Sequence, residues 1–312
     1  MLDLVIIGKG PAGLSAAIYA ARAGLSVTVI GTDYSSLSKA EVIENYFGFS
    51  KPVKGSDLLS EGKMQAESFG VDVLSDEVLS IVIDYSNPIF KILTSTATFE
   101  CKSVLIASGR PLPLVKIPGL KEFEGKGISY CTTCDGFFYK NSAIGILGNS
   151  DYAMFEAFEM ETFTKKITIY TNGKPLSLSP DLAEKLHRYK LNERPIKQLL
   201  GDELLEKILF NDDTVDIISG LFIASERPSG LDFAYKLGLS VEEGRIITDD
   251  EQKTNIKGIY AAGDCTSTFK QLSVAVGQGA IAAKSIIDFC KGKIWHRKLN
   301  LEQTLMYHIL MQ

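Results

Sequence analysis

Side chains that bind metal ions are scarce in this sequence, whose 312 residues include five cysteines and three histidines. Only Cys131 and Cys134 form a pair, in the C-x-x-C spacing that suits either a reversible disulfide or half of a four-ligand zinc site. Such a zinc site needs a second pair of ligands. The other cysteines and the histidines are isolated in the sequence: Cys101, Cys265, Cys290, His187, His296 and His308. The sequence therefore predicts no zinc site.

Long apolar runs and an excess of positive charge are lacking as well. No stretch reaches the roughly 18 apolar residues of a membrane span. A buried-strand pattern begins by Leu4, which leaves no room for a signal peptide. The net charge of −5 disfavours nucleic acid as a partner. These absences predict a cytoplasmic protein with no membrane and no nucleic-acid partner.

The cysteine pair lies in residues 129–138, SYCTTCDGFF. Because the cytoplasm keeps thiols reduced, a permanent disulfide is not expected, and a dithiol that cycles is the remaining interpretation. A cycling dithiol needs a low thiolate pKa on one sulfur and a proton donor or acceptor for the other. Asp135, directly after Cys134, suits the second role, and it equally suits the N-cap of a helix.

The opening segment, residues 4–24, carries the glycine motif of a dinucleotide-binding fold. An apolar strand runs into Gly8-x-Gly10-x-x-Gly13, and an alanine-rich helix follows. These glycines permit a tight turn, close approach of a pyrophosphate to the helix N-terminus, and close packing of helix and strand. An acidic residue for the ribose should end the next strand. A glycine stands there, so Asp33, two residues on, is the ribose candidate.

A proline-rich segment, residues 110–119, has the composition of a linker. Beyond the dithiol stretch, a strand, a turn and a helix over residues 143–163 repeat the opening motif in altered form. Ser150 replaces the middle glycine, and Ala153 is an accepted substitute for the third.

The expected contacts to a nicotinamide nucleotide are missing from this second unit. After its partner strand, residues 166–171, NAD needs an acidic residue and NADP needs arginines. The sequence continues instead with NGKP at residues 172–175. We therefore expect the architecture of a nicotinamide site without its contacts. The alternative is that Lys174 alone serves NADP.

Taken together, these segments resemble the low-molecular-weight thioredoxin reductase family along nearly the whole chain. The matches are GKGPAG near the N-terminus, Glu44-Asn45, SYCTTCDGFF, and GIYAAGDC at residues 258–265. Lys270-Gln271, at the start of a Gly/Ala-rich helix predicted over residues 270–283, stands where the family has Arg-Gln.

The resemblance implies FAD as the cofactor, thioredoxin as a partner and a homodimer. It also implies that Cys134 faces the flavin, that Cys131 attacks the protein disulfide, and that Asp135 moves the proton. The positions expected to bind FAD are Gly8, Gly10, Pro11, Ala12, Gly13, Asp33, Asn45, Val78, Gly109, Gly263, Asp264, Lys270, Gln271 and Leu272.

We expect an α/β protein with two nested, Rossmann-like domains of the dinucleotide-binding type. Residues 1–112 and 243–295 form the discontinuous FAD domain in this prediction, residues 113–242 form an inserted dithiol domain, and residues 296–312 form a C-terminal tail.

The sequence departs from the classical family at Ser150, at residues 172–175, and at residues 34–37, where Tyr-Ser-Ser-Leu replaces Gly-Gly-Gln-Leu. This pattern resembles the pyridine-nucleotide-independent branch, the ferredoxin-dependent flavin thioredoxin reductases. The predicted reaction is thus reduction of a thioredoxin disulfide with electrons from ferredoxin. Three alternatives stay open: an NADPH-dependent reductase with a divergent site, a dithiol oxidase, and a flavin redox sensor without turnover.

A basic patch is the candidate docking site for an acidic ferredoxin. Its residues surround Trp295 and His296, and a solvated helix end is the alternative interpretation. The patch consists of Lys291, Lys293, Arg297 and Lys298.

Overall fold

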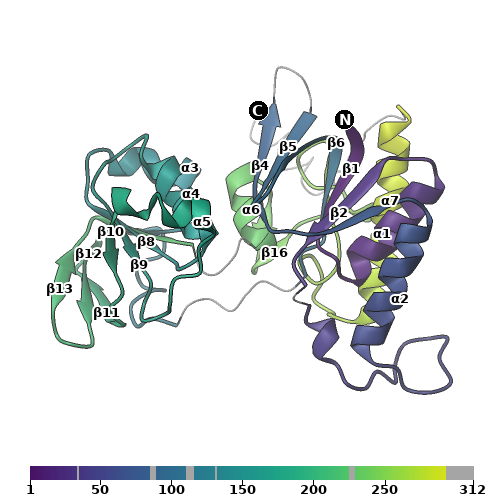
Figure 1. Ribbon diagram of the computed structural model, residues 1–312, viewed down its shortest axis with the longest axis horizontal. Helices are drawn as coiled ribbons and strands as arrows, with labels where there is room; N and C mark the ends of the chain where they lie inside the picture. Colours follow the sequence, from purple (N-terminus) through teal and green to yellow (C-terminus); the bar gives the residue numbers. More distant parts are fainter. Residues whose placement is uncertain (34, 85–88, 110–115, 131, 225–228, 293–312) are drawn as a thin grey trace, which may run out of the picture.

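A computed structural model of the chain describes residues 1–33, 35–84, 89–109, 116–130, 132–224 and 229–292, with only the backbone of Thr133 and Cys134. Figure 1 shows two lobes, each built on its own sheet.

The first lobe contains a seven-stranded sheet in the order β3-β2-β1-β6-β5-β4, with β17 pairing beside β6. Strands β1, β2, β3, β6 and β17 pair in parallel, whereas β4, β5 and β6 pair antiparallel. The strands are β1 (Leu2–Ile7), β2 (Val27–Gly31), β3 (Asp72–Ser75), β4 (Val78–Asp84), β5 (Ile89–Thr94), β6 (Thr98–Ile106) and β17 (Ile259–Ala261).

Alternate residues of these strands face two different cores, because side chains along a strand point to opposite faces. On one face, Leu4 and Ile6 pack with α1 (Pro11–Arg22), α2 (Gly55–Ser68) and α7 (Leu272–Cys290). On the other face, Val5 and Ile7 pack with α6 (Gly230–Leu237). The remaining elements of this lobe are η1 (Leu37–Lys39), β15 (Val241–Glu242) and β16 (Arg245–Ile246).

The second lobe contains a five-stranded parallel sheet in the order β10-β9-β8-β14-β7. An antiparallel sheet of β11, β12 and β13 packs its hydrophobic residues against one face of this parallel sheet. Helix α4 packs against the other face. Strands of the parallel sheet are β7 (Ile128–Ser129), β8 (Ile144–Leu147), β9 (Ile167–Tyr170), β10 (Lys190–Asn192) and β14 (Gly220–Ile223). Those of the antiparallel sheet are β11 (Ile196–Gly201), β12 (Leu205–Phe210) and β13 (Val215–Ile217). Helical segments are α3 (Thr132–Asp135), η2 (Gly136–Tyr139), α4 (Asp151–Met160), α5 (Pro180–Ala183) and η3 (Leu186–Arg188).

The predicted α/β fold with Rossmann-like units is confirmed, but the chain returns to the first lobe earlier than expected. Phe233 and Ala234 of α6 lie in the core of the first sheet. Both residues precede the predicted boundary at residue 243. They belong to the first lobe because the apolar face of α6 packs on β4 and β16 rather than on the second sheet. The other domain limits stay a prediction.

By length and composition alone, helix α7 is long and apolar enough to cross a membrane. This differs from the sequence-based expectation, in which no stretch was long and apolar enough for a span. Helices in the cores of globular proteins meet the same criteria. In this chain Gly279, Ala282, Ala283 and Ile286 of α7 are buried, and α7 packs along α1.

Gly279 provides a test of this helix contact. A Cβ atom at this position would lie 2.2 Å from the carbonyl oxygen of Ala12 in α1. We expect Gly279→Ala to lower the free energy of unfolding by about 1–3 kcal/mol, the usual cost of overpacking. The measurement is the urea midpoint of unfolding.

The matched control is Gly277→Ala in the same helix, where a Cβ atom would meet nothing within 4 Å. This change is expected to be neutral or to stabilise by up to about 1 kcal/mol, because alanine favours helix over glycine. Equal midpoints for the two variants would contradict the close contact between α1 and α7.

Candidate active site

The glycine turn between β1 and α1 has the geometry of a pyrophosphate site. Gly8 has φ +117°, and a Cβ atom there would lie 2.2 Å from the carbonyl oxygen of Ala107. A Cβ atom at Gly13 would lie 2.0 Å from the carbonyl oxygen of Gly8. Only glycine fits at both positions, because the backbone of this turn lies close to itself and to Ala107, which follows β6.

The N-terminus of α1 is open to an anion. Gly10 is the N-cap, Pro11 follows, and neither a side-chain cap nor an acidic residue in the first turn neutralises this helix end within the described part of the chain. A Cβ atom at Gly10 would meet nothing within 4 Å. The free amides and the positive end of the helix dipole therefore fit a pyrophosphate.

Predicted positions far apart in the sequence meet beside this turn. A Cβ atom on Gly263, after β17, would lie 3.0 Å from the Cβ of Ala12. The Gly263 amide donates to Gln278 Oε1 at 2.8 Å. Gln271, the N-cap of α7, accepts a hydrogen bond at Oε1 from Asn45 Nδ2 at 3.1 Å. Asp264, Lys270 and Leu272 adjoin these residues in the chain, so the first glycine turn, Asn45 and the start of α7 form one candidate FAD site.

Two predicted cofactor residues have other partners. The Asp33 carboxylate pairs with Lys9 of the glycine turn at 2.6 Å and accepts from Ser75 Oγ at 2.9 Å. The hydrogen bond from Lys9 lowers the pKa of Asp33. The Val78 side chain is buried in the core of the first sheet, so only its backbone is free to face a cofactor. Gly109 has φ +78°, as expected of a glycine turn. The roles of these residues stay predictions.

The dithiol stretch begins where β7 ends. Cys131 lies outside the described residues, as do Lys293, Arg297 and Lys298 of the predicted docking patch, whereas the backbone of Cys134 lies in α3. Asp135 Oδ2 accepts a hydrogen bond from Ser129 Oγ at 2.7 Å. Asp135 precedes η2, yet its side chain makes no capping hydrogen bond to that helix. Ser129, a buried residue of β7, was not among the predicted site residues; its position two residues before Cys131 was the available signal.

The second glycine turn, between β8 and α4, differs from the first in what lies on it. The backbone of Ser150, the N-cap of α4, forms a parallel bridge with Ser177. The Ser177 amide donates to the carbonyl oxygen of Asn149 at 2.7 Å. Asn149 Nδ2 in turn donates to the carbonyl oxygen of Pro175 at 2.8 Å. Residues 175–179 of the chain therefore lie against this second turn, at Asn149 and Ser150.

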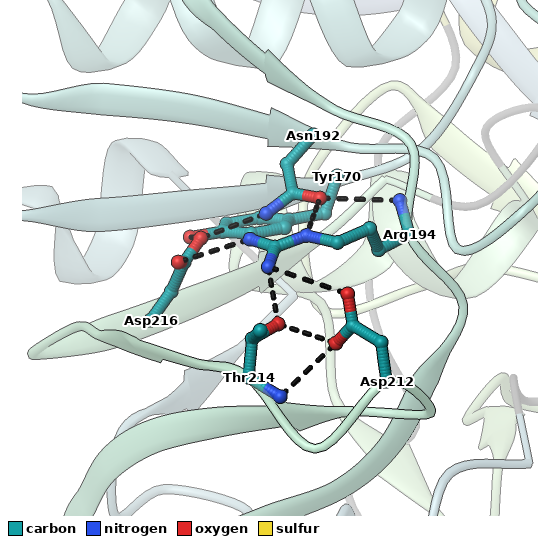
Figure 2. Close-up of polar contacts among 6 residues, drawn as sticks. All are labelled: Tyr170, Asn192, Arg194, Asp212, Thr214 and Asp216. Carbon is teal, nitrogen blue, oxygen red and sulfur yellow. Dashed lines mark hydrogen bonds and ion pairs between the residues drawn. The ribbon is translucent and has the colours of Figure 1, made fainter.

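The arginines that follow β9 are held by the protein. Arg188 pairs with Glu161 at 2.5 Å. Figure 2 shows the Arg194 guanidinium enclosed by Asn192, Thr214, Asp212 and Asp216, and it stacks 4.0 Å from the ring centroid of Phe210. Because these guanidinium groups already pair with carboxylates, the extra phosphate of NADP would compete with Glu161, Asp212 and Asp216 for them.

Comparison with known proteins places this geometry in a family. Residues 2–279 match the family model described as pyridine nucleotide-disulphide oxidoreductase. The chain belongs to this family. This oxidoreductase is 32% identical over 306 residues to thioredoxin reductase of Aquifex aeolicus, covering 93% of this chain and 94% of that protein. The predicted resemblance is thus confirmed at the level of thioredoxin reductases.

Solved structures extend the comparison. The atypical thioredoxin reductase TRi from Desulfovibrio vulgaris Hildenborough matches this oxidoreductase with a TM-score of 0.90 and 38% identity, covering 93% of this chain and 98% of that one. A ferredoxin-flavin thioredoxin reductase from Clostridium acetobutylicum matches with a TM-score of 0.68 and 30% identity, covering 94% and 99%.

Proposed function

We propose that this protein is an FAD-containing disulfide reductase that reduces thioredoxin with electrons from reduced ferredoxin. The observation that carries the proposal is the contrast between the two glycine turns. The first lies at a helix N-terminus that has no acidic residue in its first turn, whereas Asp151 stands in the first turn of α4. Residues 175–179 of the same chain lie against the second turn. We infer from this contrast that the first turn holds the cofactor and that no nicotinamide nucleotide binds at the second.

FAD, when bound, supplies the exchange between one-electron and two-electron transfer that joins ferredoxin to a disulfide. The first-lobe residues would hold it: the Gly8–Gly13 turn its pyrophosphate, and Asn45, Asp264 and Gln271 the remaining parts.

The dithiol residues would carry the exchange. Cys134 accepts an electron pair as the Cys131–Cys134 bond breaks, and two protons complete the dithiol. The Cys131 thiolate then attacks one sulfur of the thioredoxin disulfide, and Cys134 resolves the mixed disulfide, so that thioredoxin leaves with both electrons and both protons. Asp135, held by Ser129, would move a proton at these sulfurs.

The two cysteines of the dithiol must contact first the cofactor and then a protein substrate. We propose that the second lobe turns about its two connections to the first, a rigid-body motion of the usual kind. A cytoplasmic homodimer is the form we propose for the protein, following the sequence-based expectation.

Three observations support ferredoxin as the electron donor. Residues 175–179 lie against the second turn, and Arg188 and Arg194 are held in ion pairs. A relative at 30% identity is named for ferredoxin and flavin. An NADPH-dependent reductase is the second candidate, supported by the family name and by curated relatives called simply thioredoxin reductase.

Anaerobic titration with reduced ferredoxin tests the donor. We expect stoichiometric bleaching of the flavin, at a rate that falls as ionic strength rises. Changing Lys291, Lys293 and Lys298 together to Glu should slow this step roughly tenfold at low salt and flatten its salt dependence, because the acidic donor loses its attraction. Exchange between the pre-reduced dithiol and thioredoxin should be unaffected.

A flavin that reduced ferredoxin does not bleach would overturn the proposed donor. A triple variant that bleaches at the native rate in low salt would move the docking site elsewhere and leave the donor in place.

A further inference from the structure

A lysine inside the first glycine turn reaches across the ends of three strands. Lys9 follows β1, Asp33 lies two residues after β2, and Ser75 is the last residue of β3. These strands are parallel neighbours in the order β3-β2-β1, so the three residues lie at the same edge of the sheet. Nucleotides bind at this carboxyl edge in open sheets of this type.

The three side chains form a closed triangle of hydrogen bonds. Lys9 Nζ donates to Asp33 Oδ1 at 2.6 Å and to Ser75 Oγ at 2.7 Å. The Ser75 hydroxyl in turn donates to Asp33 Oδ1 at 2.9 Å. The side chain of Lys9 is 13% exposed, whereas that of Asp33 is 83% exposed. The triangle therefore fixes one carboxylate oxygen of Asp33 and leaves the carboxylate accessible from solvent.

The path of Lys9 explains why no acidic residue ends β2. In the dinucleotide-binding motif, the acid that binds the ribose stands at this strand end. A Cβ atom on Gly31, which ends β2, would lie 3.1 Å from the Lys9 amide nitrogen and 3.2 Å from Lys9 Cγ. The lysine thus occupies the space beside that position. Asp33 is the next carboxylate along the chain, and Lys9 holds it at the same edge.

One donor and one acceptor of the triangle remain for a ligand. An ammonium carries three N–H groups, and Lys9 uses two of them within the described part of the chain. Asp33 Oδ1 accepts two hydrogen bonds, whereas Oδ2 accepts none from the described residues. A ribose hydroxyl both donates and accepts. It can therefore pair with Oδ2 and with the ammonium at once.

The charge of the pair suits a neighbouring diphosphate. An unpaired carboxylate at this edge would repel a pyrophosphate at the N-terminus of α1. The hydrogen bond from Lys9 lowers the pKa of Asp33, which keeps the carboxylate ionised as an acceptor. The ammonium meanwhile balances its charge. The alternative interpretation is an ion pair that only stabilises the fold, and exposed pairs contribute little to stability.

We propose that Lys9 and Asp33 together bind the adenosine ribose of FAD, and that Ser75 is a positioning residue that holds both. The proposal rests on the FAD site given above and adds Lys9 and Ser75 to the residues expected there. A ribose hydroxyl would donate to Asp33 Oδ2 and accept from Lys9 Nζ. The pair thus recognises the adenosine half of the cofactor.

The test is the rate at which bound cofactor exchanges with an excess of isotope-labelled FAD, followed by mass spectrometry. The full-length holoprotein carries either FAD or a dideoxy cofactor, an FAD whose adenosine lacks both ribose hydroxyl groups. The wild-type protein should exchange the dideoxy cofactor roughly tenfold faster than FAD, because hydrogen bonds to charged groups are lost.

Lys9→Met removes the ammonium and keeps the length of the side chain. This variant should exchange FAD about tenfold faster than the wild type does. It should exchange the dideoxy cofactor at nearly the wild-type rate, because the hydroxyl that Lys9 recognises is already missing. Ser75→Ala should accelerate FAD exchange by a smaller factor, about threefold, and again only when the ribose hydroxyls are present.

A second triangle of the same composition lies at the opposite edge of the sheet and provides a matched control. There Lys102 Nζ lies 2.8 Å from Asp3 Oδ1, and Ser26 Oγ donates to Asp3 Oδ2 at 3.0 Å. Lys102→Met removes this pair. Lys63→Met removes a lysine whose charge also lowers the pKa of Asp33. Both controls should leave the exchange of the two cofactors nearly unchanged.

Equal exchange rates of the two cofactors from the wild-type protein would overturn the proposal. So would an acceleration in Lys9→Met that is as large with the dideoxy cofactor as with FAD. The wild-type comparison needs no substitution, so misfolding of a variant does not affect it. A purified chain that binds no FAD would instead overturn the proposed function, which keeps the two failures distinguishable.

Discussion

Cys134→Ser is expected to abolish thioredoxin reduction while leaving FAD bound. Only the transfer between cofactor and sulfur should be interrupted, since the candidate cofactor site lies in the first lobe and Cys134 lies in α3 of the second. We expect a loss of roughly a thousandfold or more in kcat, as is typical when a reacting group is removed. Turnover with thioredoxin and the flavin content after gel filtration are the two measurements.

Cys131→Ser separates the roles of the two sulfurs. This variant should also be inactive, because the sulfur that attacks thioredoxin is gone. It should nevertheless show a charge-transfer absorption between the remaining thiolate of Cys134 and the oxidised flavin, whereas Cys134→Ser should not. Normal activity in Cys131→Ser, or the reverse spectral pattern, would show that the roles are assigned wrongly.

NADPH and NADH are expected not to bleach the flavin on the timescale of turnover, even at millimolar concentration. Ser150, whose hydroxyl is buried, adds a side chain at a position where the motif for a pyrophosphate has a glycine. Residues 175–179 lie against the same turn, with Ser177 bonded to Asn149. Arg188 and Arg194 are already paired with carboxylates, which weakens the attraction of these two residues for a phosphate.

Stopped-flow absorbance under anaerobic conditions measures this expectation, with dithionite as the control that the flavin is reducible. Rapid bleaching by either nucleotide would restore the NADPH-dependent interpretation. It would also require residues 175–179 to move, which could be followed by hydrogen exchange at the Ser177 amide.

The sequence predicted the two strand–turn–helix units well, because their signals are local. Strands β8 and β9 and helix α4 all lie within the predicted ranges 143–163 and 166–171. Glycine positions such as Gly8 and Gly13 were also identified correctly. Glycine is required there because atoms a few residues away, or beside the adjacent strand, leave no room for a Cβ atom. The spacing of the three glycines makes this requirement recognisable in the sequence.

Several features of the candidate site could not be read from the sequence. Asn45 and Gln271 are 226 residues apart, and only packing brings them within hydrogen-bonding distance. Asp33 was predicted to serve the ribose, but its pairing with Lys9 and Ser75 depends on where β3 lies beside β2. The early return of α6 to the first lobe was missed, because the apolar face of α6 suits either core equally well.

The sequence by itself predicted the chemistry: which turn would accept a pyrophosphate, where the dithiol lies, and that Ser150 departs from the second glycine motif. These are properties of residue type and short spacing, which local sterics and reactivity decide. Only the tertiary structure decided that residues 175–179 lie against the second turn and that Lys236 reaches Glu156 across the lobes. The latter contact spans 80 residues and neutralises a buried charge. The residues next to a buried charge in the sequence do not reveal its partner, and those next to a turn do not reveal which segment packs on it. Both depend on how separate elements pack.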